Sequence, residues 1–166
     1  HTDVAGRAAK MGHRLTIAMN TWRATAWLVG DEPVAADLTV EVDSFRVVRS
    51  EGGLKPLAAA EKAVVRSNAL RSLAAARFPR IRFHAADIEK TAADSYRIAG
   101  TLEIRGAARE CVVDVGREDV GDAWRFAGQV EVRQSDFGVR PFSLLAGTLK
   151  VVDTVTVAIS VTRPKA

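Results

Sequence analysis

Apolar and polar residues alternate along most of this chain, and this alternation restricts its fold more than any other feature of the sequence. Over residues 124–133, apolar side chains fall on one side and charged or amide side chains on the other. A period of two residues is typical of a strand with one buried face, not of a helix. The run ends at residues 135–138, Ser-Asp-Phe-Gly, where Asp and Gly favour a turn and Phe137 anchors it.

The same alternation recurs in further stretches separated by polar or glycine-containing breaks: residues 14–20, 22–28, 38–43, 80–85, 96–105, 111–115 and 151–162. The run at 22–28 either continues the preceding strand or bends from it near Asn20. Phe45, Val47 and Val48 are expected to extend the strand at 38–43 or to pair with it, and residues 1–9 to be the tail of a first strand. So many short alternating strands predict an all-β, antiparallel barrel or sandwich of about eight strands.

Residues 57–77 are predicted to form the one inserted helix, because they are mostly strong helix formers. Its narrow apolar stripe consists of Val65, Ala69, Leu73 and Ala76. Pro79 is expected to end the helix. Residues 62–82 carry basic side chains and no acidic one: Lys62, Arg66, Arg71, Arg77, Arg80 and Arg82. We interpret this run as a solvated face, with a site for phosphate, nucleic acid or an anionic membrane surface as the alternative.

The chain has 166 residues, 48% apolar and 27% charged, and is expected to fold as one globular domain over residues 1–166. Cys111 is the only cysteine, which excludes an internal disulfide and predicts a buried, inert thiol. No run approaches the roughly 20 apolar residues that span a bilayer. No signal peptide is visible, so a cytoplasmic location is predicted. The chain begins with His1, and a truncated N-terminal strand would leave a periplasmic or secreted location open.

Several short motifs, in a fixed order, resemble those of one known family. They are Gly-His at 12–13, Phe-Pro-Arg-Ile-Arg-Phe at 78–83, Gly-Thr-Leu-Glu-Ile-Arg-Gly at 100–106, Arg-Gln-Ser-Asp-Phe-Gly-Val at 133–139, and the closing alternation at 152–159. By their order and spacing the chain resembles the YceI-like family from residue 12 onward. Members of that family are lipocalin-like barrels that bind polyisoprenoid lipids, and the family as a whole has no established chemistry.

The resemblance implies a lipocalin-like antiparallel β-barrel with a long apolar channel. Periodicity alone does not separate such a channel from a barrel filled by its own side chains. With the resemblance, we predict a channel lined by a subset of Ile17, Leu38, Val40, Phe83, Ile98, Leu102, Phe126 and Val130. Arg140 is a candidate for a phosphate in the ligand's head group, because arginine binds phosphate through two parallel hydrogen bonds.

The predicted function is non-enzymatic binding, transport or storage of a long isoprenoid-type lipid or quinone, held as a ligand with no cofactor. Nucleic acid is not an expected partner, while a peripheral membrane contact and a homodimer are left open. One alternative is an enzyme acting on a small hydrophobic substrate, which would need polar groups inside the barrel. The other is a stress-related interaction module that uses the basic helix.

The remaining polar and aromatic candidates receive structural interpretations. His13 and His84 are predicted to be structural or surface residues, since no metal-binding spacing joins them. Asp136 is predicted to bond to its own backbone in the turn, and Ser135 lacks the context of a nucleophile. No catalytic or metal-binding residue is predicted. Core packing is the default for the three tryptophans, with barrel closure or ligand stacking as the alternative: Trp22, Trp27 and Trp124.

Overall fold

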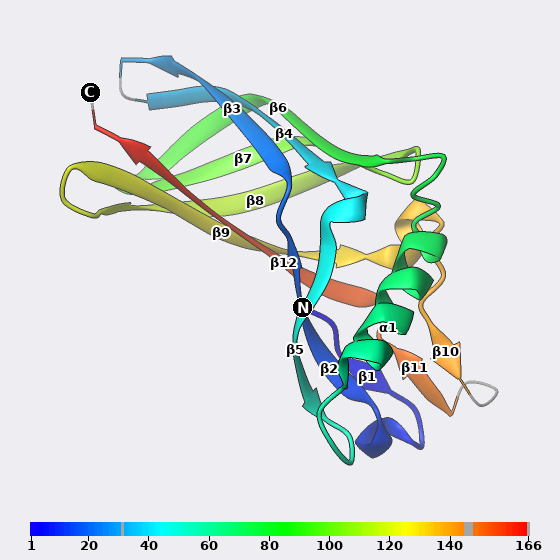
Figure 1. Ribbon diagram of the computed structural model, residues 1–166. Helices are drawn as coiled ribbons and strands as arrows, with labels where there is room; N and C mark the ends of the chain where they lie inside the picture. The colour runs from blue at the N-terminus through cyan, green and yellow to red at the C-terminus, as the bar shows by residue number, and fades with distance from the viewer. Residues whose placement is uncertain (31, 145–147, 166) are drawn as a thin grey trace.

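The computed structural model describes residues 1–30, 32–144 and 148–165. Seven strands form one antiparallel sheet that curls into a half-barrel (Figure 1). Across this sheet the strands follow in the order β12 (Thr154–Pro164), β9 (Ala123–Arg133), β8 (Ala107–Asp119), β7 (Ser95–Ile104), β6 (Arg80–Ala92), β4 (Glu32–Glu41) and β3 (Trp22–Val29). The prediction of an all-β, barrel-like antiparallel fold with one helix is therefore confirmed.

Two smaller sheets lie at the end of the half-barrel where the helix packs (Figure 1). One pairs β2 (His13–Met19) with β5 (Phe45–Gly52), and the other consists of β1 (Val4–Ala5), β11 (Leu149–Val151) and β10 (Ser143–Leu144). A 3₁₀ turn, η1 (Ala9–Met11), separates β1 from β2.

The bend expected near Asn20 separates β2 from β3. The segment after residue 43 does not extend β4. The 3₁₀ turn η2 (Val42–Ser44), anchored by the buried side chain of Val42, redirects the chain so that β5 pairs with β2.

The helix α1 (Ala59–Ser72) is shorter than predicted. It begins where the Glu61 carboxylate accepts a hydrogen bond from the Ala58 backbone N–H at 2.7 Å. The chain leaves the helical path after Ser72, and Ala74 adopts a left-handed φ of 51°. The expectation that Pro79 ends the helix is therefore wrong, because a local turn ends it several residues earlier.

The best-packed core lies beside α1, at what we call the helix end of the half-barrel. It is built on the nearly fully buried Val132, Phe137 and Val139, around which Leu73, Leu102, Ile104, Ala107, Val130 and Val155 pack; we call these nine residues the core cluster. Phe137 belongs to the 3₁₀ turn η3 (Gln134–Phe137), which Gly138 closes with a φ of 67°. The turn predicted at residues 135–138 is thus confirmed. The turns joining β6 to β7 and β8 to β9 mark the opposite, far end (Figure 1).

Candidate functional site

The apolar residues of the half-barrel share one face, which we call the inner face. Directly paired residues on neighbouring strands point to the same side of a sheet. Leu38 pairs with Phe83, which pairs in turn with Leu102. The register continues through β8 to Phe126 and Val130 on β9. It thereby brings together seven of the nine predicted site residues: Leu38, Val40, Phe83, Ile98, Leu102, Phe126 and Val130.

The other two predicted site residues lie elsewhere. Ile17 pairs with Val47 in the separate two-stranded sheet, because the bend after β2 directs it away from the seven-stranded sheet. Arg140 is exposed and follows η3 at the helix end. The structure therefore separates the candidate head-group residue from most of the predicted channel lining.

Several side chains of the inner face stay partly exposed. Leu38, Phe83 and Leu102 are each only half-buried. At the two edges of the sheet, Trp22 is 42% exposed and Val157 47% exposed. Both belong to the inner face, because Trp22 pairs with Val40 and Val157 with Val130. An apolar surface, interrupted on β8 by Arg109 and Arg117, thus runs across the half-barrel and stays partly open to solvent.

Two glycines on the inner face allow neighbouring backbone to approach closely. A Cβ on Gly100 would lie 2.4 Å from the His84 carbonyl oxygen, and one on Gly128 would lie 2.7 Å from the Asp114 carbonyl oxygen. Either contact would force backbone to move. The glycine at position 128 therefore has a structural explanation, close packing within the curled sheet.

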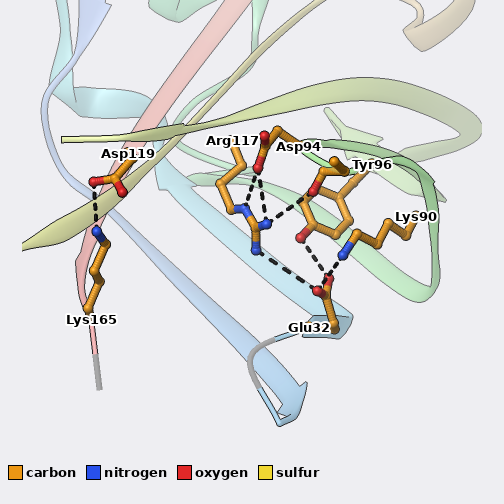
Figure 2. Close-up of polar contacts among 8 residues, drawn as sticks. Glu32, Lys90, Asp94, Tyr96, Arg117, Asp119 and Lys165 are labelled. Atoms are coloured by element: carbon orange, nitrogen blue, oxygen red, sulfur yellow. Dashed lines mark hydrogen bonds and ion pairs between the residues drawn. The ribbon is translucent and has the colours of Figure 1, made fainter. Parts of the chain in front are cut away.

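A polar cluster closes off the inner face at the far end, and we call it the far-end cluster: Glu32, Lys90, Asp94, Tyr96 and Arg117 (Figure 2). The Glu32 carboxylate accepts hydrogen bonds from Lys90 Nζ at 2.6 Å and from the Tyr96 hydroxyl at 2.7 Å. Arg117 donates to Asp94 through Nε at 3.1 Å, and its Nη1 lies 3.9 Å from Glu32. The cluster joins β4 to β8, which lie three strands apart, so it spans the curl of the sheet.

The far-end cluster is charge-balanced, and its interactions keep Tyr96 protonated and Glu32 ionised at neutral pH. Burial and the hydrogen bond to Glu32 raise the pKa of Tyr96 to about 12. Hydrogen bonds from Lys90 and Tyr96 hold the pKa of Glu32 below its ordinary value. At neutral pH Tyr96 is protonated and Glu32 ionised, and neither has a pKa suited to proton transfer there. The cluster therefore acts as a structural closure.

The three tryptophans have different environments. Trp124 lies between two cations at the far end, with Arg117 Cζ and Lys165 Nζ each 4.5 Å from its ring centroid. Lys165 Nζ also bonds to Asp119 at 2.7 Å (Figure 2). Trp22 and Trp27 are 42% and 48% exposed, so the default expectation of core packing is wrong for both.

The other polar candidates are structural. His13 Nε2 lies 2.8 Å from the Lys55 carbonyl oxygen, and His84 Nδ1 lies 2.5 Å from an Asp37 carboxylate oxygen on the outer face. The backbone of the 135–138 turn is held by Asp153, which accepts hydrogen bonds from the Ser135 N–H at 2.8 Å and from its hydroxyl at 2.5 Å. Asp136 is exposed and makes no such bond within the described part of the chain, so the prediction that its carboxylate bonds to the turn is wrong.

Half of the six basic side chains at residues 62–82 are neutralised by acids from other segments. The ion pairs are Arg66 with Asp43, Arg80 with Glu41, and Arg82 with Glu103. Arg66 also donates to the Phe45 and Asp43 carbonyl oxygens. The interpretation as a solvated, locally compensated face is favoured for these residues. Among the residues that the structure describes, Arg71 bonds to the neutral Asn68 and pairs with no carboxylate.

Comparisons with known proteins agree with this fold. The sequence profile of the YceI-like domain matches residues 1–163. The chain is similar to the crystal structure of BcnA from Burkholderia cenocepacia, with a TM-score of 0.68 and 18% identity over 89% of this chain and 86% of that chain. It is also similar to the YCEI protein of Campylobacter jejuni, with a TM-score of 0.69 and 17% identity over 92% and 86%. No curated protein matches the chain. Within the described residues, no helix is long and apolar enough to cross a membrane.

Proposed function

The chain belongs to the YceI-like family, and on that premise we propose that it is a non-enzymatic carrier of a long apolar molecule. The ligand class is an isoprenoid-type lipid or a quinone, bound, transported or stored along the inner face. No cofactor takes part in this function, because the ligand is held by burial alone.

The observation that carries the proposal is the partly open apolar inner face. It is bounded by the apolar core cluster at the helix end and by the far-end cluster at the other. Burying apolar area contributes about 25 cal/mol per Å², or about 0.8 kcal/mol per CH₂ group. A five-carbon unit would thus contribute at most roughly 4 kcal/mol, so a few units give high affinity without polar recognition.

The dimensions of the sheet favour a long ligand over a small one. Strand β7 has 10 residues, and at about 3.3 Å per residue it extends roughly 33 Å. An extended chain can follow this length, whereas a small substrate would cover only part of it.

The enzymatic alternative is less well supported. It requires convergent polar groups that are unpaired or have a pKa suited to proton transfer, and the polar residues of the far-end cluster are already paired with one another. The interaction-module alternative relied on Arg66 and Arg71, and Arg66 is occupied by Asp43. A homodimer, a peripheral membrane contact and the cytoplasmic location stay predictions.

The proposal is tested by native mass spectrometry of the protein from its own organism, followed by organic extraction and lipid analysis. A stoichiometric isoprenoid or quinone is expected. In parallel, binding of farnesol is compared between Val157→Asp and Ala158→Asp. These positions are adjacent on an exposed edge strand, but Val157 belongs to the inner face and Ala158 to the outer face.

Only Val157→Asp is expected to weaken farnesol binding, because it places a charge on the apolar surface. Circular dichroism of both variants controls for folding. An empty protein that also fails to bind farnesol would refute the carrier function. Equal losses in two folded variants would refute the assignment of the inner face.

A further inference from the structure

A pocket of about 470 Å³ lies at the helix end, and its lining includes three arginines. The last turns of α1 contribute Asn68, Arg71 and Ser72, the β7–β8 turn contributes Arg105, and the loop after η3 contributes Gly138 and Arg140. No carboxylate is among its described lining residues. We call it the arginine pocket.

The arginines of this pocket differ from most others in the chain. Eight arginines elsewhere each have a carboxylate partner: Arg49, Arg66, Arg80, Arg82, Arg97, Arg117, Arg125 and Arg133. In the pocket, Arg71 Nη2 donates to the neutral Asn68 amide oxygen at 2.9 Å. Among the described residues, no hydrogen bond or ion pair engages Arg140. Three positive charges therefore converge without compensation.

Arg105 supplies an unsatisfied donor that is held in place. It occupies a tight hairpin turn in which Arg105 and Gly106 both have positive φ, 53° and 75°. Its Nη1 donates to the Gly138 carbonyl oxygen. Its buried Nε–H finds no partner in the described part of the chain. A buried donor left without an acceptor is unfavourable, and an anion entering the pocket would relieve this.

Three carbonyl groups at the end of α1 are already engaged, which leaves fewer free acceptors to oppose this positive potential. The carbonyl oxygens of Ala69, Leu70 and Arg71 accept hydrogen bonds from backbone N–H groups of the turn that follows the helix. Free carbonyls at a helix C-terminus would disfavour an anion. The Asn68 amide and the Ser72 hydroxyl add neutral polar groups to the lining.

We infer that the arginine pocket binds a phosphate-type oxyanion, a phosphate or diphosphate group. Guanidinium groups bind phosphate oxygens through paired, charge-assisted hydrogen bonds, and three uncompensated charges favour a multiply charged group. The pocket lies beside the core cluster, since Ser72 precedes Leu73 and Arg105 follows Ile104. The anion can therefore be free or be the head group of a lipid, and this inference does not require the carrier function.

The test measures pyrophosphate binding by isothermal titration calorimetry at low ionic strength. Arg140→Gln is compared with Arg23→Gln, which removes the same charge from an exposed position on β3. Losing one charged hydrogen-bond donor is expected to weaken binding about tenfold or more in Arg140→Gln. Arg23→Gln should bind like the wild type. Absence of pyrophosphate binding, or equal weakening in both variants, would overturn the inference.

Farnesyl diphosphate and farnesol distinguish the two sources of the anion. If Arg140→Gln weakens farnesyl diphosphate but leaves farnesol unchanged, the pocket accepts a lipid head group. If only pyrophosphate is affected, it accepts a free anion. If farnesol binds but Arg140→Gln weakens the binding of none of the three ligands, the pocket is refuted and the carrier function is retained. If pyrophosphate binds and Arg140→Gln weakens it, but farnesol does not bind, the pocket is supported and the carrier function is refuted.

Discussion

Tyr96 is the only tyrosine in the chain, so its ionisation can be followed directly by the ultraviolet absorbance of tyrosinate. Its side chain is 2% exposed and donates to Glu32 at 2.7 Å. Burial and this hydrogen bond raise its pKa from 10.0 to about 12. We therefore expect the folded protein to show no tyrosinate near pH 10, and the urea-unfolded protein to titrate there.

The same shift predicts how stability depends on alkaline pH. Because the folded pKa is raised, the stabilisation is fully present below pH 10.0 and is lost as the pH rises through about 12. The difference between the two pKa values corresponds to an upper limit of about 2.7 kcal/mol. Urea unfolding at a series of pH values should follow this loss in the wild type and much less of it in Tyr96→Phe.

Glu32→Gln isolates the contribution of the carboxylate. Removing its charge should lower the pKa of Tyr96 toward the ordinary value, while burial keeps part of the shift. Glu118→Gln is the matched control, because Glu118 pairs with Arg125 on the outer face and should leave Tyr96 unchanged. Tyrosinate appearing near pH 10 while circular dichroism shows an intact sheet would refute the buried Tyr96–Glu32 pair.

Three further perturbations address the packing and the turns. Phe137→Ala should lower the free energy of unfolding by about 3–5 kcal/mol, because this side chain is 5% exposed in the core cluster. Phe142→Ala, at a position 42% exposed, should have little effect in the same urea titration. Gly100→Ala should destabilise by about 1–3 kcal/mol through its backbone clash, and Gly116→Ala, whose nearest obstacle is 3.9 Å away, should lower the melting temperature much less. Hydrogen bonds from Ser135 lower the pKa of Asp153, so ionised Asp153 stabilises the fold above its ordinary pKa of 3.8, and this stabilisation is lost as the pH falls. Asp153→Asn should therefore reduce the loss of unfolding free energy at acidic pH, and an unchanged pH dependence in urea unfolding would contradict this role.

The sequence predicts which residues share the inner face, because the apolar positions of each alternating strand pair with apolar positions of the neighbouring strand. Phe83 and Leu102 lie far apart in the sequence, yet both obey the period of two and pair directly. Ile17 was misplaced because the same period continues on both sides of a bend. Alternation reports which face a residue occupies within its own strand, and it does not report which sheet the strand joins.

The far-end cluster was not predicted, for two physical reasons. A bulge in β6 between His84 and Asp87 shifts the alternation, so Lys90 could not be assigned to the inner face by counting from Phe83. Glu32 lies between the strands predicted at 22–28 and 38–43, and its contact with Tyr96 joins strands far apart in the sequence. Arg117, at the next inner-face position after Val115, was a local signal of a polar residue in an apolar register, but Arg109 on the same strand gives the same signal and does not belong to the cluster.

The length of the helix was overestimated because helix propensity alone was used to place its end, whereas tertiary packing and a local turn end it. Residues 73–77 favour a helix by composition, but Leu73 packs into the core cluster and Ala74 takes a left-handed conformation. The arginine pocket depends on this early stop, because its lining combines the end of α1 with two turns that lie elsewhere in the sequence.

The lone thiol provides a built-in reporter of occupancy. Cys111 pairs with Gly100 on the inner face and is half-buried, and burial raises its pKa. It should therefore be alkylated slowly, since the thiolate is the reactive form. A lipid lying along the inner face would shield this sulfur further, so the labelling rate of the unmodified protein becomes a direct readout of ligand binding that needs no engineered probe.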